Sequence, residues 1–130
     1  MMLQEPPLDN AADDAGGSSG QSVTAVLRAA LAPLAARIDA AFIYGAPAKG
    51  AMPRHGDIDV MIIGIGIAYT DVIPPLIQAA ARIGRGINPG IYSAGEVTRK
   101  LAGGNRLVLA VLKQRKIFLI GSEDDIPRPR

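Results

Sequence analysis

The fold of this chain is decided by the stretch YGAPAKGAMPRHGDIDVMIIG, which covers residues 44–64. An apolar run leads into it and ends at Gly45, and a second apolar run, 58–63, closes it. This pattern predicts two strands joined by a loop that opens with a glycine turn. Asp57 opens the second strand and Asp59 lies inside it. Because side chains alternate along a strand, both carboxylates are expected on one face of the sheet.

Paired carboxylates at the head of a strand predict a site for a divalent cation. Two neighbouring carboxylates repel each other and resist burial unless a cation lies between them. Mg²⁺ suits such oxygen ligands, because it keeps several waters and takes one or two carboxylates together with substrate phosphates. Gly45 permits a sharp turn, after which backbone amides can hold a phosphate. The alternative is that Asp57 caps the strand and Asp59 is an exposed edge residue.

The composition predicts one aliphatic domain in a reducing compartment. The chain has 130 residues, of which 48% are hydrophobic and 4% aromatic. It contains no cysteine, which excludes disulfides and thiolate metal sites and fits a cytoplasmic protein. Its formal net charge of +2 is too small to argue for nucleic acid as a partner. No stretch has the length and purity of a membrane helix, so no membrane association is expected.

The rest of the sequence predicts a tail followed by a domain of alternating strands and helices. Residues 1–21 are interpreted as a disordered tail or linker, 22–126 as the domain, and 127–130 as a flexible tail. Hydrophobic periodicity predicts helices over 23–37 (interrupted at Pro33), 70–83, 94–102 and 106–114, and strands over 39–44, 58–63, 86–92 and 116–120. Such alternation indicates an α/β or α+β fold, with a mixed sheet of about four strands and helices packed on it.

Capping residues and helical spacing predict where the helices begin and what they bury. Thr70 or Asp71 is expected to cap the second helix. Ser93 and Glu96 match a capping box at the start of the third, and Asn105 is expected to cap the fourth. Eight apolar residues of the second and fourth helices are expected to face inward: Leu76, Ile77, Ala80, Ile83, Leu107, Val108, Val111 and Leu112.

The central stretch resembles the nucleotidyltransferase superfamily of DNA polymerase beta, in its minimal bacterial form. The family pattern is Gly-Ser, then a basic residue with glycine, then Asp-x-Asp at the head of the next strand. In this chain the pattern is present as Gly45-Ala46, Lys49-Gly50 and Asp57-Ile58-Asp59. Later pieces resemble the nucleotidyltransferase domains that are often fused to winged-helix regulators: Asn88 to Ser93, Gly104-Asn105 and Lys116 to Gly121. The resemblance covers roughly residues 23–126.

This resemblance implies a nucleoside triphosphate, expected to be ATP, bound with Mg²⁺. It assigns the metal and the catalytic role to Asp57 and Asp59. It assigns the phosphates to the turn at Gly45 and Ala46, together with Lys49. In the family a nucleophile attacks the α-phosphorus and pyrophosphate leaves, so that a nucleotidyl group passes to a protein or small-molecule acceptor. The resemblance also implies a small helical protein partner, as in toxin–antitoxin pairs.

Three departures from the family pattern leave the activity open. Ala46 replaces the serine of the Gly-Ser turn, and Pro47 removes one more amide. Asn88 occupies the position of a third carboxylate in active members, and an amide cannot act as a base. The alternative hypothesis is therefore a catalytically degenerate domain that senses a nucleotide or binds a partner, like an antitoxin.

Two side chains in the central loop are further candidates for the site. Arg54 and His55 precede Asp57 closely, and either is a candidate contact for phosphate. The competing interpretation for both, and for Lys49, is a solvated loop side chain.

Overall fold

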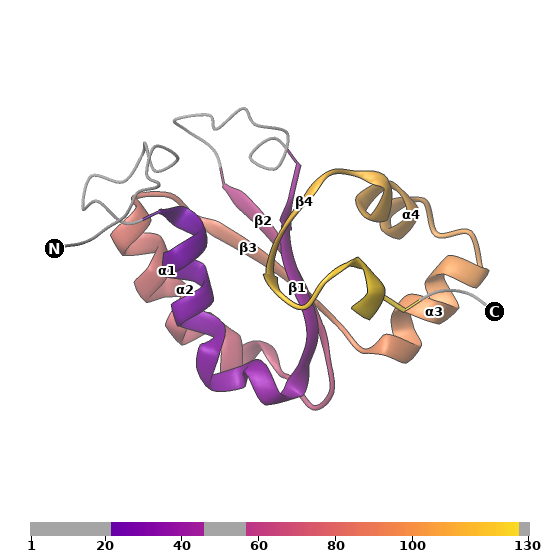
Figure 1. Ribbon diagram of the computed structural model, residues 1–130, viewed down its shortest axis with the longest axis horizontal. Coiled ribbons are helices and arrows are strands. Elements are labelled where there is room, and N and C mark those ends of the chain that lie inside the picture. Colours follow the sequence, from indigo (N-terminus) through magenta and orange to yellow (C-terminus); the bar gives the residue numbers. More distant parts are fainter. Residues whose placement is uncertain (1–21, 46–56, 128–130) are drawn as a thin grey trace, which may run out of the picture.

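A computed structural model describes residues 22–45 and 57–127, and in it a four-stranded sheet lies between two pairs of helices (Figure 1). The elements are α1 (Val23–Leu31), η2 (Ala32–Arg37), β1 (Ile38–Tyr44), β2 (Ile58–Gly64), α2 (Tyr69–Ile83), β3 (Ile87–Tyr92), α3 (Ala94–Ala102), α4 (Arg106–Lys113), β4 (Lys116–Ile120) and η4 (Glu123–Asp125). The expected mixed sheet with helices packed on it is confirmed. The stretches interpreted as tails, 1–21 and 128–130, and the loop 46–56 lie outside the described residues.

The order and directions of the strands determine which strand termini lie side by side at each end of the sheet. The order is β3-β2-β1-β4, with β1 antiparallel to both of its neighbours and β2 parallel to β3. The end of β1 therefore meets the starts of β2, β3 and β4. Strand β3 contains Pro89, which has no amide to donate, and this strand lies at a sheet edge, where such an amide is not needed for pairing.

An irregularity at Asp39 places Ile38 and Ala40 of β1 on opposite faces of the sheet, although residues two apart in a regular strand share a face. The pairing of β1 with β2 shifts by one residue there. Ile38 and Ala41 consequently pack on the side of α1 and α2, whereas Ala40 and Phe42 pack on the side of α3 and α4. Such a bulge reverses the alternation of faces along a strand.

The sheet and the two helix pairs form three layers, and an aliphatic core lies between the sheet and each helix pair. Leu27 and Leu31 of α1 are fully buried against β1 and β2 in the first core. In the second, Val97 of α3 and Val111 of α4 pack on the opposite face, around Phe42. Each fully buried side chain of this kind stabilises the fold by about 1.5–3 kcal/mol. No described helix is long and apolar enough to cross a membrane.

Several predicted helix boundaries are confirmed by the hydrogen bonds at the helix ends. The first helix divides at Pro33, where the chain passes into the 3-10 helix η2. Ser93 and Glu96 each accept a hydrogen bond from the other's amide, at 3.1 and 2.9 Å. The side chain of Asn105 accepts from the Val108 amide at 2.9 Å and caps α4.

The cap predicted for α2 is wrong. The helix begins at Tyr69 and its cap position is Ala68, two or three residues before the expected cap at Thr70 or Asp71. Asp71 is the third helical residue, and its carboxylate accepts from the Ala68 amide at 3.0 Å. A carboxylate in the first turn also interacts favourably with the helix dipole, which accounts for Asp71 there.

Two of the predicted inward side chains point outward instead. Ile77 is 63% exposed and Leu107 is 64% exposed. The buried line of α2 runs through Val72, Leu76 and Ala79, and Ile77 lies about 100° around the helix from Leu76. Helical spacing does not decide which neighbouring apolar residue faces the sheet when two occur in succession.

Candidate functional site

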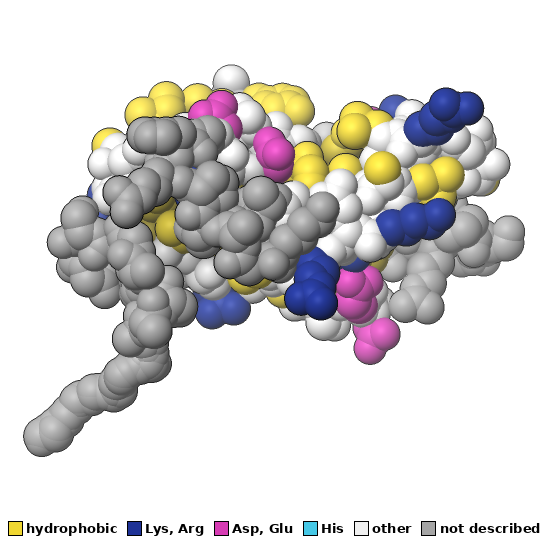
Figure 2. Space-filling model, turned by 90° about the horizontal axis from the view of Figure 1, so that it is seen from above, with side chains coloured by type: hydrophobic (Ala, Val, Ile, Leu, Met, Phe, Trp, Pro, Cys, Tyr) yellow, Lys and Arg dark blue, Asp and Glu magenta, His cyan; other side chains and the backbone are white. Residues whose placement is uncertain are grey.

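Four side chains form a row across the end of the sheet where β2 begins. Strand pairing places them in the order Asn88, Asp59, Tyr44 and Lys116, one from each strand. Paired residues on neighbouring strands project to the same face. Tyr44 packs with the second core, so the row lies on the face that carries α3 and α4. Acidic side chains are exposed at this end of the molecule in the view of Figure 2.

Asp59 is the only carboxylate in this row, and it is half-buried. The Nδ2 group of Asn88 donates a long hydrogen bond of 3.4 Å to Asp59 Oδ1. Asp59 forms no ion pair with any described residue. Among the described residues this half-buried carboxylate has one long hydrogen bond for support, and a cation would stabilise it further.

Asp57 precedes the strand and leans toward β3. The amide of Ile58 donates to the Gly86 carbonyl at 2.9 Å, which fixes the chain beside β3. A Cβ atom added to Gly86 would lie 2.5 Å from Asp57 Oδ1, closer than the two atoms can approach. A larger residue at Gly86 would therefore displace the Asp57 carboxylate from this position, a relation that the sequence did not reveal.

Gly45 makes the turn that the sequence predicts. Its φ is +88°, a left-handed conformation that costs other residues about 1–2 kcal/mol. The turn stands directly beside the Asp59 carboxylate, because a Cβ at Gly45 would lie 3.9 Å from Asp59 Oδ2. The remaining predicted site residues lie outside the described part of the chain: Ala46, Lys49, Arg54 and His55.

Tyr44 offers a neutral phenol next to Asp59. Burial raises the pKa of Tyr44 above its ordinary value of 10.0, and the charges of Asp59 and Tyr92 act in the same direction. A raised pKa keeps the phenol protonated at neutral pH, so Tyr44 can donate a hydrogen bond there.

Lys116 fixes the end of α4 next to this row. Its side chain is only 3% exposed. The ammonium donates to the carbonyls of Leu112 at 2.7 Å and Gln114 at 3.3 Å, and to the Glu123 carboxylate at 2.8 Å. It also lies 5.6 Å from the centre of the Phe42 ring. These contacts hold the ammonium in place, so we assign Lys116 a structural role: it fixes the end of α4 beside the site.

Gln114 is a neighbour of the site that sequence reasoning missed. A Cβ on Gly45 would lie 3.9 Å from Gln114 Oε1, the same distance as from Asp59 Oδ2. A glutamine at the end of an amphipathic helix is ordinarily a solvated residue, and so its sequence position gave no signal.

The acidic residues fit Mg²⁺ in company with a phosphate ligand. In the described part of the chain, no three His, Cys, Asp or Glu side chains come together as a metal centre. Asp57 and Asp59 are two carboxylates at one strand head, which is the protein contribution that Mg²⁺ takes when phosphates and waters complete its coordination.

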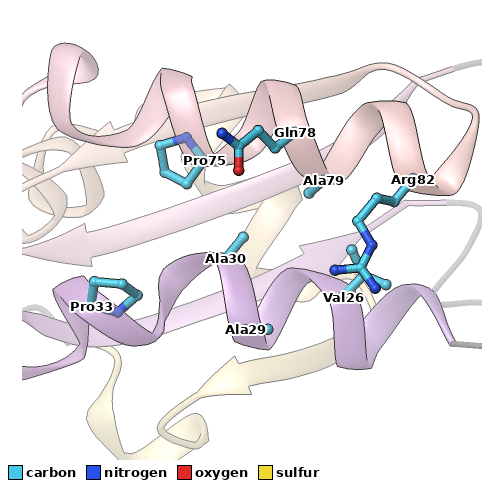
Figure 3. A pocket seen from close by; sticks show the side chains of 8 residues that line it. All are labelled: Val26, Ala29, Ala30, Pro33, Pro75, Gln78, Ala79 and Arg82. Atoms are coloured by element: carbon cyan, nitrogen blue, oxygen red, sulfur yellow. The ribbon is translucent and has the colours of Figure 1, made fainter.

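Two hollows among the described residues lie away from Asp59. One, of about 270 Å³, is a groove between α1 and α2, with Pro33 and Pro75 at one end and Arg82 at the other (Figure 3). Another, of about 390 Å³, lies where β2 and β3 end, beside Tyr69 and Glu96. Neither includes a residue of the row.

Comparison with protein-family models finds no match to this sequence, and comparison with curated proteins finds none. Among solved structures, a chain of the toxin–antitoxin complex MntA–HpeT matches with a TM-score of 0.54 and 9% sequence identity. The match covers 78% of this chain and 76% of that chain. The chain has a nucleotidyltransferase fold.

A second structure shares this nucleotidyltransferase fold. It is a toxin–antitoxin complex with AMP-PNP, and it matches with a TM-score of 0.51 and 10% identity over 78% of this chain and 76% of that one. The MntA–HpeT structure is a mutant in which two aspartates, two positions apart, are replaced by glutamate. At these identities the likeness concerns the fold.

Proposed function

We propose that this chain binds a nucleoside triphosphate with Mg²⁺ at the head of β2 and transfers a nucleotidyl group to an acceptor. The observation that carries the proposal is the position of Asp59: it is half-buried, it stands beside the glycine turn at Gly45, and it pairs with no described cation. The nucleotidyltransferase fold and the AMP-PNP in one matched complex support it.

Each residue of the site has a proposed role. Asp57 and Asp59 hold the metal, whose charge would offset the charge that grows on the phosphoryl oxygens. The turn at Gly45 brings the backbone close to the phosphates, with Ala46 and Lys49 as further contacts. Arg54 and His55 remain candidate phosphate contacts, and ATP is the expected nucleotide.

The acceptor is proposed to be a protein or a small molecule in the cytoplasm. Both matched structures are toxin–antitoxin complexes, which supports a protein partner for this chain. A small helical protein remains the expected partner.

Asn88 favours a second candidate function, a degenerate domain that binds a nucleotide or a partner without transfer. The structure places Asn88 directly beside Asp59, with its amide group donating to the carboxylate. An amide at this position gives the carboxylate a hydrogen-bond donor. Unlike a carboxylate, it cannot accept a proton from a nucleophile.

Calorimetric titration of ATP, with and without Mg²⁺, tests the binding step. Wild type is expected to bind only with Mg²⁺, and Asp59→Asn is expected to lose that binding. The matched control is Asp39→Asn, which removes an exposed carboxylate from the opposite end of β1 and should bind as wild type does. Equal binding by wild type and Asp59→Asn would overturn the proposed site.

A transfer assay with labelled ATP separates the two candidate functions. Label that moves to a partner protein or a small molecule, and does so only when Asp59 is intact, supports the transferase. Binding that depends on Mg²⁺ without any transfer supports the degenerate domain.

A further inference from the structure

Two oxygen atoms from distant parts of the chain face the same turn. Asp59 Oδ2 on β2 and Gln114 Oε1 after α4 each lie 3.9 Å from the position that a Cβ on Gly45 would take. The two oxygens are therefore no more than about 8 Å apart. A Mg²⁺ ion that keeps its waters links oxygens across about this distance, with metal–oxygen bonds of about 2.1 Å followed by hydrogen bonds.

Asn88 and Gln114 present opposite ends of their carboxamides to the site. Asn88 turns its Nδ2 donor toward Asp59. Gln114 has its Oε1 acceptor near Gly45. Amide carbonyl oxygens are among the ligands of hard divalent cations, whereas amide nitrogens are not.

We infer that Gln114 is the third oxygen donor of the metal site, reaching the ion directly or through one of its waters. The inference rests on the proposed function and adds a residue to it. Gln114 takes the place of a third carboxylate, which Asn88 does not provide because its side chain is a neutral amide that donates to Asp59.

The backbone at Gln114 is held firmly enough for this role. Gln114 is half-buried and ends α4, with its own amide donating to the Val111 carbonyl at 3.1 Å. Its carbonyl accepts from the buried ammonium of Lys116, which also binds the Leu112 carbonyl and Glu123. The side chain therefore extends from a fixed backbone toward Gly45.

Mn²⁺ binding measured by electron paramagnetic resonance tests this inference, with and without AMP-PNP, because free and bound Mn²⁺ are counted without any enzymatic turnover. Gln114→Ala removes a neutral donor and is expected to weaken Mn²⁺ binding about threefold to tenfold. Gln114→Glu supplies a carboxylate and is expected to tighten it about threefold or more. A gain in affinity cannot come from a folding defect.

The matched control is Gln78→Ala, because Gln78 is exposed in the groove between α1 and α2. It should leave Mn²⁺ affinity unchanged. One outcome would overturn the role of Gln114 alone. In that outcome wild type binds Mn²⁺, Asp59→Asn does not, and both Gln114 variants bind Mn²⁺ as tightly as wild type does. Wild type that binds no Mn²⁺, with or without AMP-PNP, would overturn the proposed function as well.

Discussion

At the scale of single residues, the two described side chains that flank Asp59 across the sheet are neutral, and this shapes the chemistry of the site. Asn88 donates to it, and Tyr44 stands opposite it on β1. A carboxylate among neutral donors remains available to a metal ion, whereas an ion pair with Lys or Arg would compete with the metal. The nearest basic residue of the row, Lys116, is directed to two carbonyls and Glu123.

Replacing Tyr44 by Phe should change how stability depends on pH. The pKa of Tyr44 is raised above 10.0 in the fold, so the folded state holds this proton more tightly than the unfolded state does. Stability should therefore fall as the pH rises from about 10 through the raised pKa. Tyr44→Phe removes this loss and should gain stability relative to wild type between about pH 9 and about pH 11.

Urea denaturation at both pH values checks this expectation. Tyr69→Phe is the control, because Tyr69 is 53% exposed. A difference in the free energy of unfolding between wild type and Tyr44→Phe that stays constant from the lower to the higher pH would contradict the account.

At the scale of secondary-structure elements, α4, β4 and η4 are joined by the buried ammonium of Lys116. Lys116→Met keeps most of the apolar stem but leaves the carbonyls of Leu112 and Gln114 without their donor. We expect a loss of about 2–4 kcal/mol in the free energy of unfolding. Glu123→Gln should cost less than about 1 kcal/mol, because its side chain is 61% exposed. Thermal and urea denaturation give both values, and equal effects of the two changes would contradict the account.

Most elements could be predicted from sequence because their signals are local. The glycine turn at Gly45, the division at Pro33 and the box of Ser93 and Glu96 each involve residues only a few positions apart. The start of α2 was misplaced because Asp71 acts from the third helical position, and an acidic residue near a helix start fits several positions equally well. Whether Ile77 faces the sheet or the solvent depends on how α2 packs, which the local sequence does not specify.

The site could be predicted only in part, because its remaining neighbours come from other strands and helices. The spacing of Asp57 and Asp59 in the sequence predicted that both lie at the head of one strand. The closeness of Gly86 to Asp57 and of Gln114 to Gly45 arises only when β3 and α4 pack against the sheet. Neither relation leaves a pattern in the sequence.

At the scale of the whole molecule, two cores on opposite faces of one sheet hold the site in place. The helices that cover the two faces are seen in Figure 1. Leu27→Ala empties a fully buried position under α1 and should lower the free energy of unfolding by about 2–5 kcal/mol. Ile77→Ala changes a side chain that is 63% exposed and should cost less than about 0.5 kcal/mol. Urea denaturation of both variants checks the packing of this layer, and a larger effect at Ile77 than at Leu27 would contradict it.

If the head of β2 binds a divalent metal with a nucleotide, the position of that metal can be found by paramagnetic broadening. Mn²⁺ with ATP, added in small amounts to ¹⁵N-labelled protein, broadens the amide signals of residues near the ion. We expect selective broadening at Tyr44, Asp59 and Asn88, with Gly66, just beyond the far end of β2, unaffected. Broadening centred elsewhere, or the same pattern in Asp59→Asn, would contradict the account.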